Sequence, residues 1–247
     1  LVIAQDLSYY GIDIYGKTQL AELINQVSEV DGIEWIRLHY LYPTKFPIDI
    51  LPVMRENVKV CNYLDMPLQH IANPVLKRMM RHVTREETET LIKKIKQEVP
   101  GVVIRTTMLV GFPGETDADV EELKQFIRDM KFERLGVFPY SQEEGTYAGD
   151  KFADDLSEKI KQNRANEIME IQQQISAELN QQKIGETFKV IIDKKEGEFF
   201  IGRTEFDSPE VDGEVLITSE KGLKIGDFVE VKITGAEDYD LYAEAII

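Results

Sequence analysis

A glycine-rich turn is the segment of this sequence best suited to chemistry. Residues Leu109–Thr116 read LVGFPGET, and they follow an apolar run and open a charged helical pattern. Gly111 and Gly114 flank a proline, so the chain must turn sharply, and a glycine can supply the positive φ. Thr116 is placed to cap the next helix, which carries Glu115 to the mouth of a strand–turn–helix unit, where α/β proteins bind ligands. The alternative is a tight βα connection with an ordinary acidic cap.

The turn belongs to an alternation of strand and helix patterns over about 140 residues. Apolar runs typical of strands lie at Val2–Ala4, Ile33–Leu41, Tyr63–Leu68, Val102–Val110 and Glu133–Pro139. Helical patterns lie between them at Lys17–Val30, Ile48–Asn57, Pro74–Met80, Arg85–Glu98 and Thr116–Met130. Thr84 and Glu87 predict a capping box for the fourth helix. The alternation predicts a parallel α/β sheet.

Each predicted strand ends on polar or turn-forming residues. They are Gln5-Asp6, Tyr40 to Tyr42, Gln69-His70, Gly111 to Glu115, and Tyr140-Ser141-Gln142. In a barrel the carboxyl ends of the strands meet at one face, so these groups predict a ligand site there without identifying the ligand.

The remainder of the chain changes character twice. Residues 155–183 repeat apolar side chains every three or four positions and predict a long amphipathic helix, with Asp155 and Glu158 as its capping box. From Ile184 onward, short strand patterns separated by glycines predict a small five-stranded barrel. We therefore expect three parts, at residues 1–150, 151–183 and 184–247.

Composition limits the class of protein. The 247 residues carry a net charge of −16, which disfavours nucleic-acid partners at long range. No apolar run is long enough for a membrane span, and no secretory signal is present, so we expect a cytoplasmic location. We also expect a monomer. The single cysteine, Cys61, cannot form an internal disulfide or a cysteine-ligated cluster from this chain alone. The chain starts with Leu1 inside a strand pattern, and we expect a segment to precede it.

Several segments together resemble the methylthiotransferases of the radical S-adenosylmethionine (SAM) superfamily. The resemblance covers nearly the whole chain, and the barrel from Ile184 is similar to a TRAM domain. Within the family, the sequence at Gln5-Asp6 and at Gln69-His70 is most similar to that of the branch that modifies a ribosomal protein. The segments that carry it are Ile3–Asp6 with Tyr10-Gly11, Asp65–His70, Arg78–Arg85, Arg105–Thr116, Phe138–Ser141 with Gly145-Thr146, Gly202–Thr204, Asp212-Gly213 and Gly226-Asp227.

The resemblance implies a partial (β/α)₆ barrel followed by the TRAM barrel. Its first strand and a Cys-x-x-x-Cys-x-x-Cys loop would precede Leu1, and the loop would hold a [4Fe–4S] cluster that binds SAM. A second [4Fe–4S] cluster would lie further upstream. No metal ligands are expected in this chain, and without the cluster cysteines the chain by itself should be inactive.

The family also implies roles for the strand ends. Gln5 and Asp6 would hold the methionyl amino group of SAM, since an ammonium needs carboxylate or carbonyl acceptors. Gln69 and His70 would contact the ribose or the substrate, although His70 could equally be a packed imidazole. The alternative for Gln5 and Asp6 is a strand-ending turn.

Other residues would bind the rest of SAM. Arg105 is a candidate for its carboxylate if the strand register turns the side chain into the barrel, and Arg81 is the second candidate. Residues Gly111, Phe112, Gly114 and Glu115 would present backbone to the adenine. Phe138 and Tyr140 would flank the pocket, or pack as core aromatics.

Charge favours one of the family's two substrate classes. Residues 184–247 contain 16 acidic and 7 basic residues, a net charge of −9. An RNA-binding TRAM domain needs a basic groove, whereas an acidic one would attract a basic ribosomal protein. We therefore expect methylthiolation of the β-carbon of an aspartate of ribosomal protein uS12. The alternatives are a transfer-RNA methylthiotransferase, which modifies an adenosine, and a non-catalytic binding module.

Overall fold

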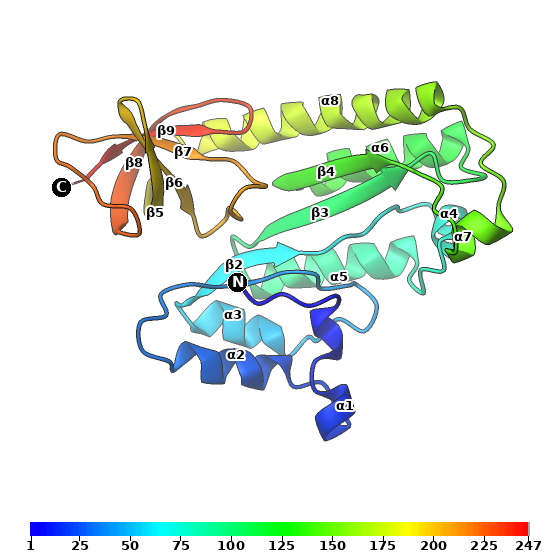
Figure 1. The fold of residues 1–247 in the computed structure, drawn as a ribbon, viewed down its shortest axis with the longest axis horizontal. Coiled ribbons are helices and arrows are strands. Elements are labelled where there is room, and N and C mark those ends of the chain that lie inside the picture. Colours follow the sequence, from blue (N-terminus) through cyan, green and yellow to red (C-terminus); the bar gives the residue numbers. More distant parts are fainter. Residues whose placement is uncertain (247) are drawn as a thin grey trace. The chain divides into compact units, whose positions relative to one another are not determined.

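The computed structural model describes residues 1–246, and the final residue lies outside the described part of the chain. The chain forms two compact units, residues 1–172 and residues from 173 onward, which are described separately (Figure 1). The boundary falls inside a long helix, so the three-part division at residues 150 and 183 remains an expectation.

The first unit is built on a parallel sheet, as predicted, but the sheet has four strands where five were expected. Its strands are β1 (Ile36–Leu38), β2 (Val60–Asp65), β3 (Val103–Val110) and β4 (Arg134–Pro139), in that spatial order. The predicted strand at Val2–Ala4 is reduced to one parallel bridge between Val2 and Leu38. The parallel order brings the carboxyl ends of β2, β3 and β4 to one edge of the sheet (Figure 1).

Helices of the first unit follow the predicted pattern with shifted ends. They are η1 (Leu7–Tyr9), α1 (Ile12–Tyr15), α2 (Leu20–Ser28), α3 (Ile50–Glu56), α4 (Asn73–Arg78), α5 (Arg85–Glu98), α6 (Asp117–Met130) and α7 (Tyr147–Lys151). The capping box of Thr84 and Glu87 is confirmed, and Thr116 forms a second one with Asp119. These caps satisfy the first amides of the helices and fix where α5 and α6 begin.

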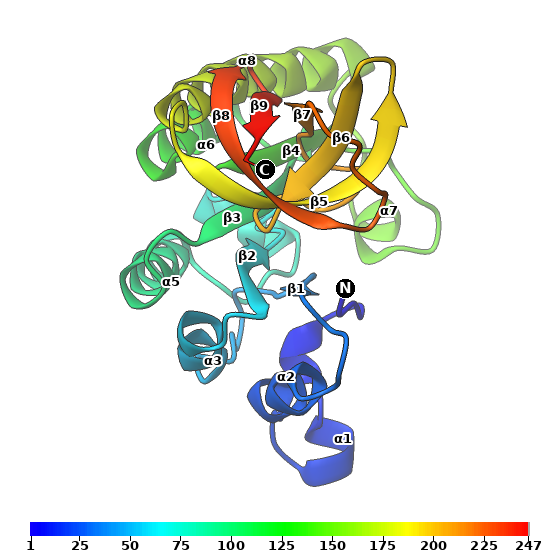
Figure 2. The ribbon, with the colours of Figure 1, turned by 90° about the vertical axis from the view of Figure 1, so that its left-hand side faces the viewer.

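The two faces of the sheet differ. Helices α3, α5 and α6 lie on one side of it (Figure 2), and fully buried residues of β3 alternate with half-buried ones. Because successive side chains point to opposite faces, the half-buried set lies on the face away from these helices. The buried set is Ile104, Thr106, Met108 and Val110, and the half-buried set is Arg105, Thr107 and Leu109. Arg105 therefore lies on the face of the sheet away from these helices, which we call the inner face.

A single helix, α8 (Glu158–Gln182), spans the boundary between the units. Its predicted capping box of Asp155 and Glu158 is wrong: the amide of Ile160 donates to Oγ of Ser157 at 3.4 Å, and the helix starts directly after that serine. The carboxylate of Asp155 instead accepts from the amide of Gly114. The buried face of α8 is more polar than predicted, and it comprises Lys161, Arg164, Ala165, Ile168, Gln172, Ile175, Ser176 and Asn180.

The second unit contains the predicted five-stranded barrel. Its strands are β5 (Thr187–Glu196), β6 (Phe199–Thr204), β7 (Val215–Thr218), β8 (Phe228–Ala236) and β9 (Leu241–Ala245), closed in the order β5-β6-β7-β9-β8 (Figure 2). Alternating residues such as Val190, Ile192, Val231 and Ile233 fill its interior. Closure removes the exposed strand edges that would otherwise pair with other chains.

Among the helices of residues 1–246, none has the length and apolar character that a bilayer crossing requires.

Candidate functional site

A pocket opens at the carboxyl ends of β2, β3 and β4. Its cavity volume is about 310 Å³, near the lower end of the range for small-molecule sites, about 300–1,000 Å³. Four predicted site residues line it, namely Gln69, Arg81, Phe112 and Tyr140, together with Leu109 and residues of α4 and α7. The structure thus brings together residues that are far apart in the sequence. An apolar cavity with the amide of Gln69 and the guanidinium groups of Arg78 and Arg81 at its wall suits a ligand with a flat apolar part and a charged end.

Aromatic packing forms one wall of the pocket. Phe112 meets Tyr140 edge to face with ring centroids 5.1 Å apart, and it meets Phe152 in the same manner at 6.1 Å. Phe112 and Tyr140 are buried and belong to one small apolar cluster with Ala72 and Val75. Edge-to-face aromatic packing restrains ring orientation, so this wall is preformed.

The turn between β3 and α6 has the predicted backbone. Gly111 and Gly114 have φ of +75° and +79°, in the left-handed region. A Cβ on Gly114 would lie 2.7 Å from Cζ of Arg78, and one on Gly111 would overlap the side chain of Lys161. The backbone conformation therefore favours glycine at both positions, and at Gly111 the buried stem of Lys161 also leaves no space for a side chain.

Glu115 does not face the mouth of the barrel. Its side chain is fully buried, and its two oxygens accept from the amide of Gly111 at 2.9 and 3.0 Å. His70 lies beside it, with Nε2 3.4 Å from Oε2 of Glu115. The amide of Ala72 donates to Nδ1 of His70 at 3.0 Å, so Nε2 is the nitrogen that carries a proton, and this buried Nε2 makes no hydrogen bond within the described residues. Both side chains are fully buried, and among Gly111–Glu115 only Phe112 lines the pocket.

Arg105 lies on the inner face, but it already has an acidic partner. Its Nη1 lies 3.0 Å from Oδ1 of Asp65, and Oδ2 of Asp65 lies 3.3 Å from Nδ1 of His39. Burial acts to raise the pKa of Asp65, but the His39 hydrogen bond and the Arg105 charge outweigh it and hold that pKa below its ordinary value. A ligand carboxylate would have to compete with Asp65 for Arg105.

Arg81 is better placed to receive a carboxylate. It lines the pocket, and its guanidinium stacks over the ring of Tyr42, with Cζ 4.8 Å from the centroid. Burial lowers the pKa of Arg81, while Tyr42 and the more distant charge of Asp6 oppose this effect. Of the two arginines predicted for the SAM carboxylate, the second is thus the one on the pocket.

The remaining predicted residues are distributed differently. Asp6 is the N-cap of η1 and accepts from the amide of Ser8 at 2.9 Å, and Gln5 is exposed; neither lines the pocket. Phe138 pairs with Leu109 across the ladder between β3 and β4 and is 59% exposed. These assignments to a cofactor stay predictions.

Three cations around the turn were not anticipated. Nε of Arg78 donates to the carbonyl of Pro113 at 2.8 Å, and its Cζ lies 4.3 Å from the centroid of the Phe152 ring. Arg164 and Lys161 of α8 contact the turn from the other side. The sequence did contain a signal for Lys161 and Arg164. Both lie within or beside the apolar stripe of the long helix, where a charged side chain needs a buried partner.

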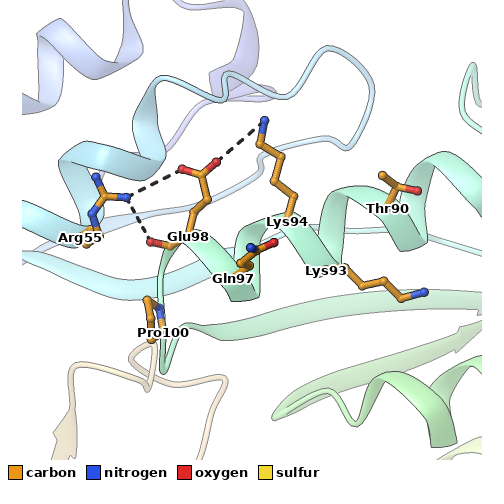
Figure 3. Close-up of a pocket in the computed structure, with 7 residues that line it drawn as sticks. All are labelled: Arg55, Thr90, Lys93, Lys94, Gln97, Glu98 and Pro100. Carbon is orange, nitrogen blue, oxygen red and sulfur yellow. Dashed lines mark hydrogen bonds and ion pairs between the residues drawn. The ribbon is translucent and has the colours of Figure 1, made fainter.

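A larger hollow lies elsewhere and does not have the character of a site. It has a volume of about 780 Å³ and lies on α5 and α3, near Pro100, at the amino end of β3. Figure 3 shows Glu98 between Arg55 and Lys94, with nitrogen–oxygen distances of 3.8 and 3.9 Å. The charges in this hollow pair with one another at the surface of outer helices, and such ion pairs contribute little energy.

Within residues 1–246, no group of three or more His, Cys, Asp or Glu side chains is arranged to hold a metal ion. The single cysteine, Cys61, is buried in β2.

Comparison with known proteins identifies both units. Residues 7–127 match the radical SAM superfamily, and residues 184–246 match the TRAM domain. The fold is also similar to that of coproporphyrinogen III oxidase (HemN) from Escherichia coli, a radical SAM enzyme, with a TM-score of 0.50 and 19% identity over 64% of this chain and 36% of that one.

Curated relatives cover the whole chain. "Ribosomal protein uS12 methylthiotransferase RimO" of Christiangramia forsetii is 58% identical over 247 residues, all of this chain and 55% of the relative. The proteins of the same name from Phocaeicola vulgatus and Bacteroides thetaiotaomicron are 54% and 55% identical over 99% of this chain, and 57% and 56% of each relative. The chain thus spans little more than half the length of these relatives. It belongs to the radical SAM methylthiotransferase family and carries a radical SAM domain followed by a TRAM domain.

Proposed function

We propose that this chain, within its full-length protein, binds SAM and takes part in methylthiolation of the β-carbon of an aspartate of ribosomal protein uS12. The observation that carries the proposal is the pocket at the carboxyl ends of β2, β3 and β4, in a chain more than half identical to proteins with that activity in their name. A ribosomal substrate would place the reaction in the cytoplasm.

The residues present fit SAM. The apolar wall of Leu109, Phe112 and Tyr140 suits the adenine. Arg81 would hold the carboxylate of the methionyl group, with Gln69 beside it as a neutral hydrogen-bonding group. In this family, SAM supplies a methyl group and a hydrogen-abstracting radical when bound with its cluster.

The two [4Fe–4S] clusters would be held outside this chain. A cluster needs several thiolates, and this chain has one cysteine, which is buried. The chain's own contribution is to bind and orient the nucleoside and to exclude water from it through the packed rings of Phe112, Tyr140 and Phe152.

The TRAM barrel supports a basic protein substrate over RNA. Its hollow of about 590 Å³ is lined by five acidic and two basic side chains. Both basic side chains are paired: Lys194 lies 3.1 Å from Glu214, and Arg203 lies 3.0 Å from Asp193. The acidic groups are Asp193, Glu210, Asp212, Glu214 and Asp240. Such a surface attracts a cationic protein and repels phosphates.

The test is an assay of the cluster-loaded, full-length protein with SAM and either uS12 or transfer RNA. We expect a methylthio group on an aspartate-containing peptide of uS12, detected by mass spectrometry, and no modified adenosine. Modification of transfer RNA with uS12 untouched would establish the alternative substrate class. Binding of uS12 without modification of either would instead favour a non-catalytic module.

A further inference from the structure

We infer that Arg164 and Lys161 of α8 are positioning residues that hold the turn Gly111–Glu115 in its binding conformation and so set the affinity of the pocket for a nucleoside. The ligand in this inference rests on the proposed SAM site. The contacts of the two cations do not depend on it.

Arg164 links the last residue of the turn to the first residue of α6. Its Nη1 donates to Oε1 of Glu115 at 2.8 Å, and its Nη2 donates to Oδ1 of Asp117 at 2.7 Å. The Arg164 side chain is 9% exposed and that of Glu115 is fully buried. A single guanidinium thus ties the last residue of the turn and the first residue of α6 to a third element, and its fork geometry allows both bonds at once.

Glu115 depends on this arginine. The amide of Gly111 also donates to its carboxylate, and the imidazole of His70 lies 3.4 Å away without a hydrogen bond to it. Without Arg164, the carboxylate would be a buried negative charge with no cation, which is strongly unfavourable. It would turn toward solvent or take up a proton, and in the first case the amide of Gly111 would lose its acceptor.

Lys161 supports the same turn one helical turn earlier. Its side chain is fully buried, and its aliphatic stem fills the space that a Cβ on Gly111 would need. Nζ donates to Glu158 at 2.7 Å and to Asp154, and it lies 5.5 Å from the centroid of the Tyr140 ring. Lys161 therefore contacts both the turn and the wall of the pocket, and it does so through its stem as well as its charge.

The turn needs such support because of its own sequence. Glycine at two of its five positions gives the isolated segment many accessible conformations. If only a fraction of molecules hold the binding conformation, the apparent affinity for the ligand falls by that fraction. Removing the support should weaken nucleoside binding without removing any group that touches the nucleoside.

The experiment uses the cluster-loaded, full-length protein with Arg164→Met, Arg164→Lys, Lys161→Met and Lys161→Ala. Lys159→Ala is the matched control, since Lys159 is an exposed lysine on the same helix. Two quantities are measured: the hydrogen-exchange rate of the Gly111 amide, and the dissociation constant of S-adenosylhomocysteine by calorimetry. We expect Arg164→Met to raise both about tenfold or more, and Arg164→Lys to recover part of the loss, because a lysine restores one charge but not the bridge.

The lysine variants separate stem from charge. Lys161→Met keeps most of the stem and should have the smaller effect, whereas Lys161→Ala opens space beneath Gly111 and should raise both quantities; Lys159→Ala should change neither. Where Arg164→Met fails to fold, the pair Glu115→Gln/Arg164→Met removes both charges together, and its Gly111 amide should still exchange faster than in the wild type.

The two proposals fail in different ways. An unchanged exchange rate at Gly111 in the Arg164 variants overturns the positioning role, whether or not the protein binds the nucleoside. Faster exchange with unchanged affinity also overturns it. A wild-type protein that binds neither S-adenosylhomocysteine nor SAM overturns the proposed function and the ligand part of the inference, and the exchange rates then decide the structural part alone.

Discussion

Nη1 of Arg105 lies 3.0 Å from Oδ1 of Asp65, across the ladder that joins β3 to β2, on the face of the sheet away from α5 and α6. Asp65 is almost fully buried, and its second oxygen faces His39. The inner face of the sheet therefore carries an internal charge network below the pocket, and this network has a structural role that can be measured separately from ligand binding.

Asp65→Asn should lower the free energy of unfolding by about 3 kcal/mol, because it leaves Arg105 and His39 without their shared carboxylate. Urea denaturation at neutral pH measures this change. Asp31→Asn is the control, since Asp31 is exposed, and it should stay within about 0.5 kcal/mol of the wild type. A change at Asp65 no larger than that of the control would contradict a structural role for the pair.

The same pair predicts a pH dependence. The folded-state pKa of Asp65 is lowered from 3.8, so its contribution to stability is fully present above that value and is lost as the pH falls through the folded-state pKa. The stability difference between the wild type and Asp65→Asn should therefore narrow as the pH falls below about pH 4. A difference that widens on acidification would show that the sign is wrong.

Gly111→Ala should destabilise the protein by more than the backbone strain that alanine suffers at a positive φ. Gly101 has nearly the same conformation, with φ of +80° against +75°, but a Cβ there would meet nothing within 4 Å. Gly101→Ala measures the backbone strain alone, about 1–2 kcal/mol. Gly111→Ala should cost about 1–3 kcal/mol more, because the new methyl group would overlap the buried Lys161. If thermal or urea unfolding shows the same loss of stability for Gly101→Ala and Gly111→Ala, the turn and Lys161 can accommodate the new methyl group.

Arg81→Met should discriminate between two ligands. If Arg81 binds the SAM carboxylate, the dissociation constant of S-adenosylhomocysteine should rise about 10- to 100-fold. That of 5′-methylthioadenosine, which has no carboxylate, should change by no more than about twofold. Arg85→Met is the control, because Arg85 pairs with Glu89 and Glu122 and does not line the pocket. An equal loss for both ligands would assign Arg81 to the shape of the pocket.

The acidic hollow of the TRAM barrel can be tested by charge removal. Glu210 and Glu214 line it and are exposed, so Glu210→Gln/Glu214→Gln should weaken binding of uS12 several-fold, mainly through slower association. The loss should shrink at high salt. Glu230→Gln/Glu244→Gln removes the same charge from exposed positions outside the hollow and should have the smaller effect. Equal effects would mean that net charge, and not this surface, attracts the partner.

Local sequence determined much of this fold. The capping residues at Thr84 and Thr116 predict the starts of α5 and α6, since a cap depends only on residues a few positions apart. The alternation of apolar runs predicts the parallel sheet and the closed barrel, because burial of one or both faces imposes a period on the chain. The positive φ at Gly114 likewise follows from the turn sequence itself.

Only the tertiary structure decided what faces the ligand. Glu115 was expected at the mouth, but Arg164 lies 49 positions further along the chain and draws its carboxylate inward. The register between β2 and β3 places Arg105 opposite Asp65, and the two side chains form an ion pair. Of the two arginines predicted to bind the SAM carboxylate, Arg81 is the one that lines the pocket. Such pairings depend on which charged side chains the fold brings together in buried positions. The energy of a buried charge is set by these partners, which lie far away in the sequence, and not by its sequence neighbours.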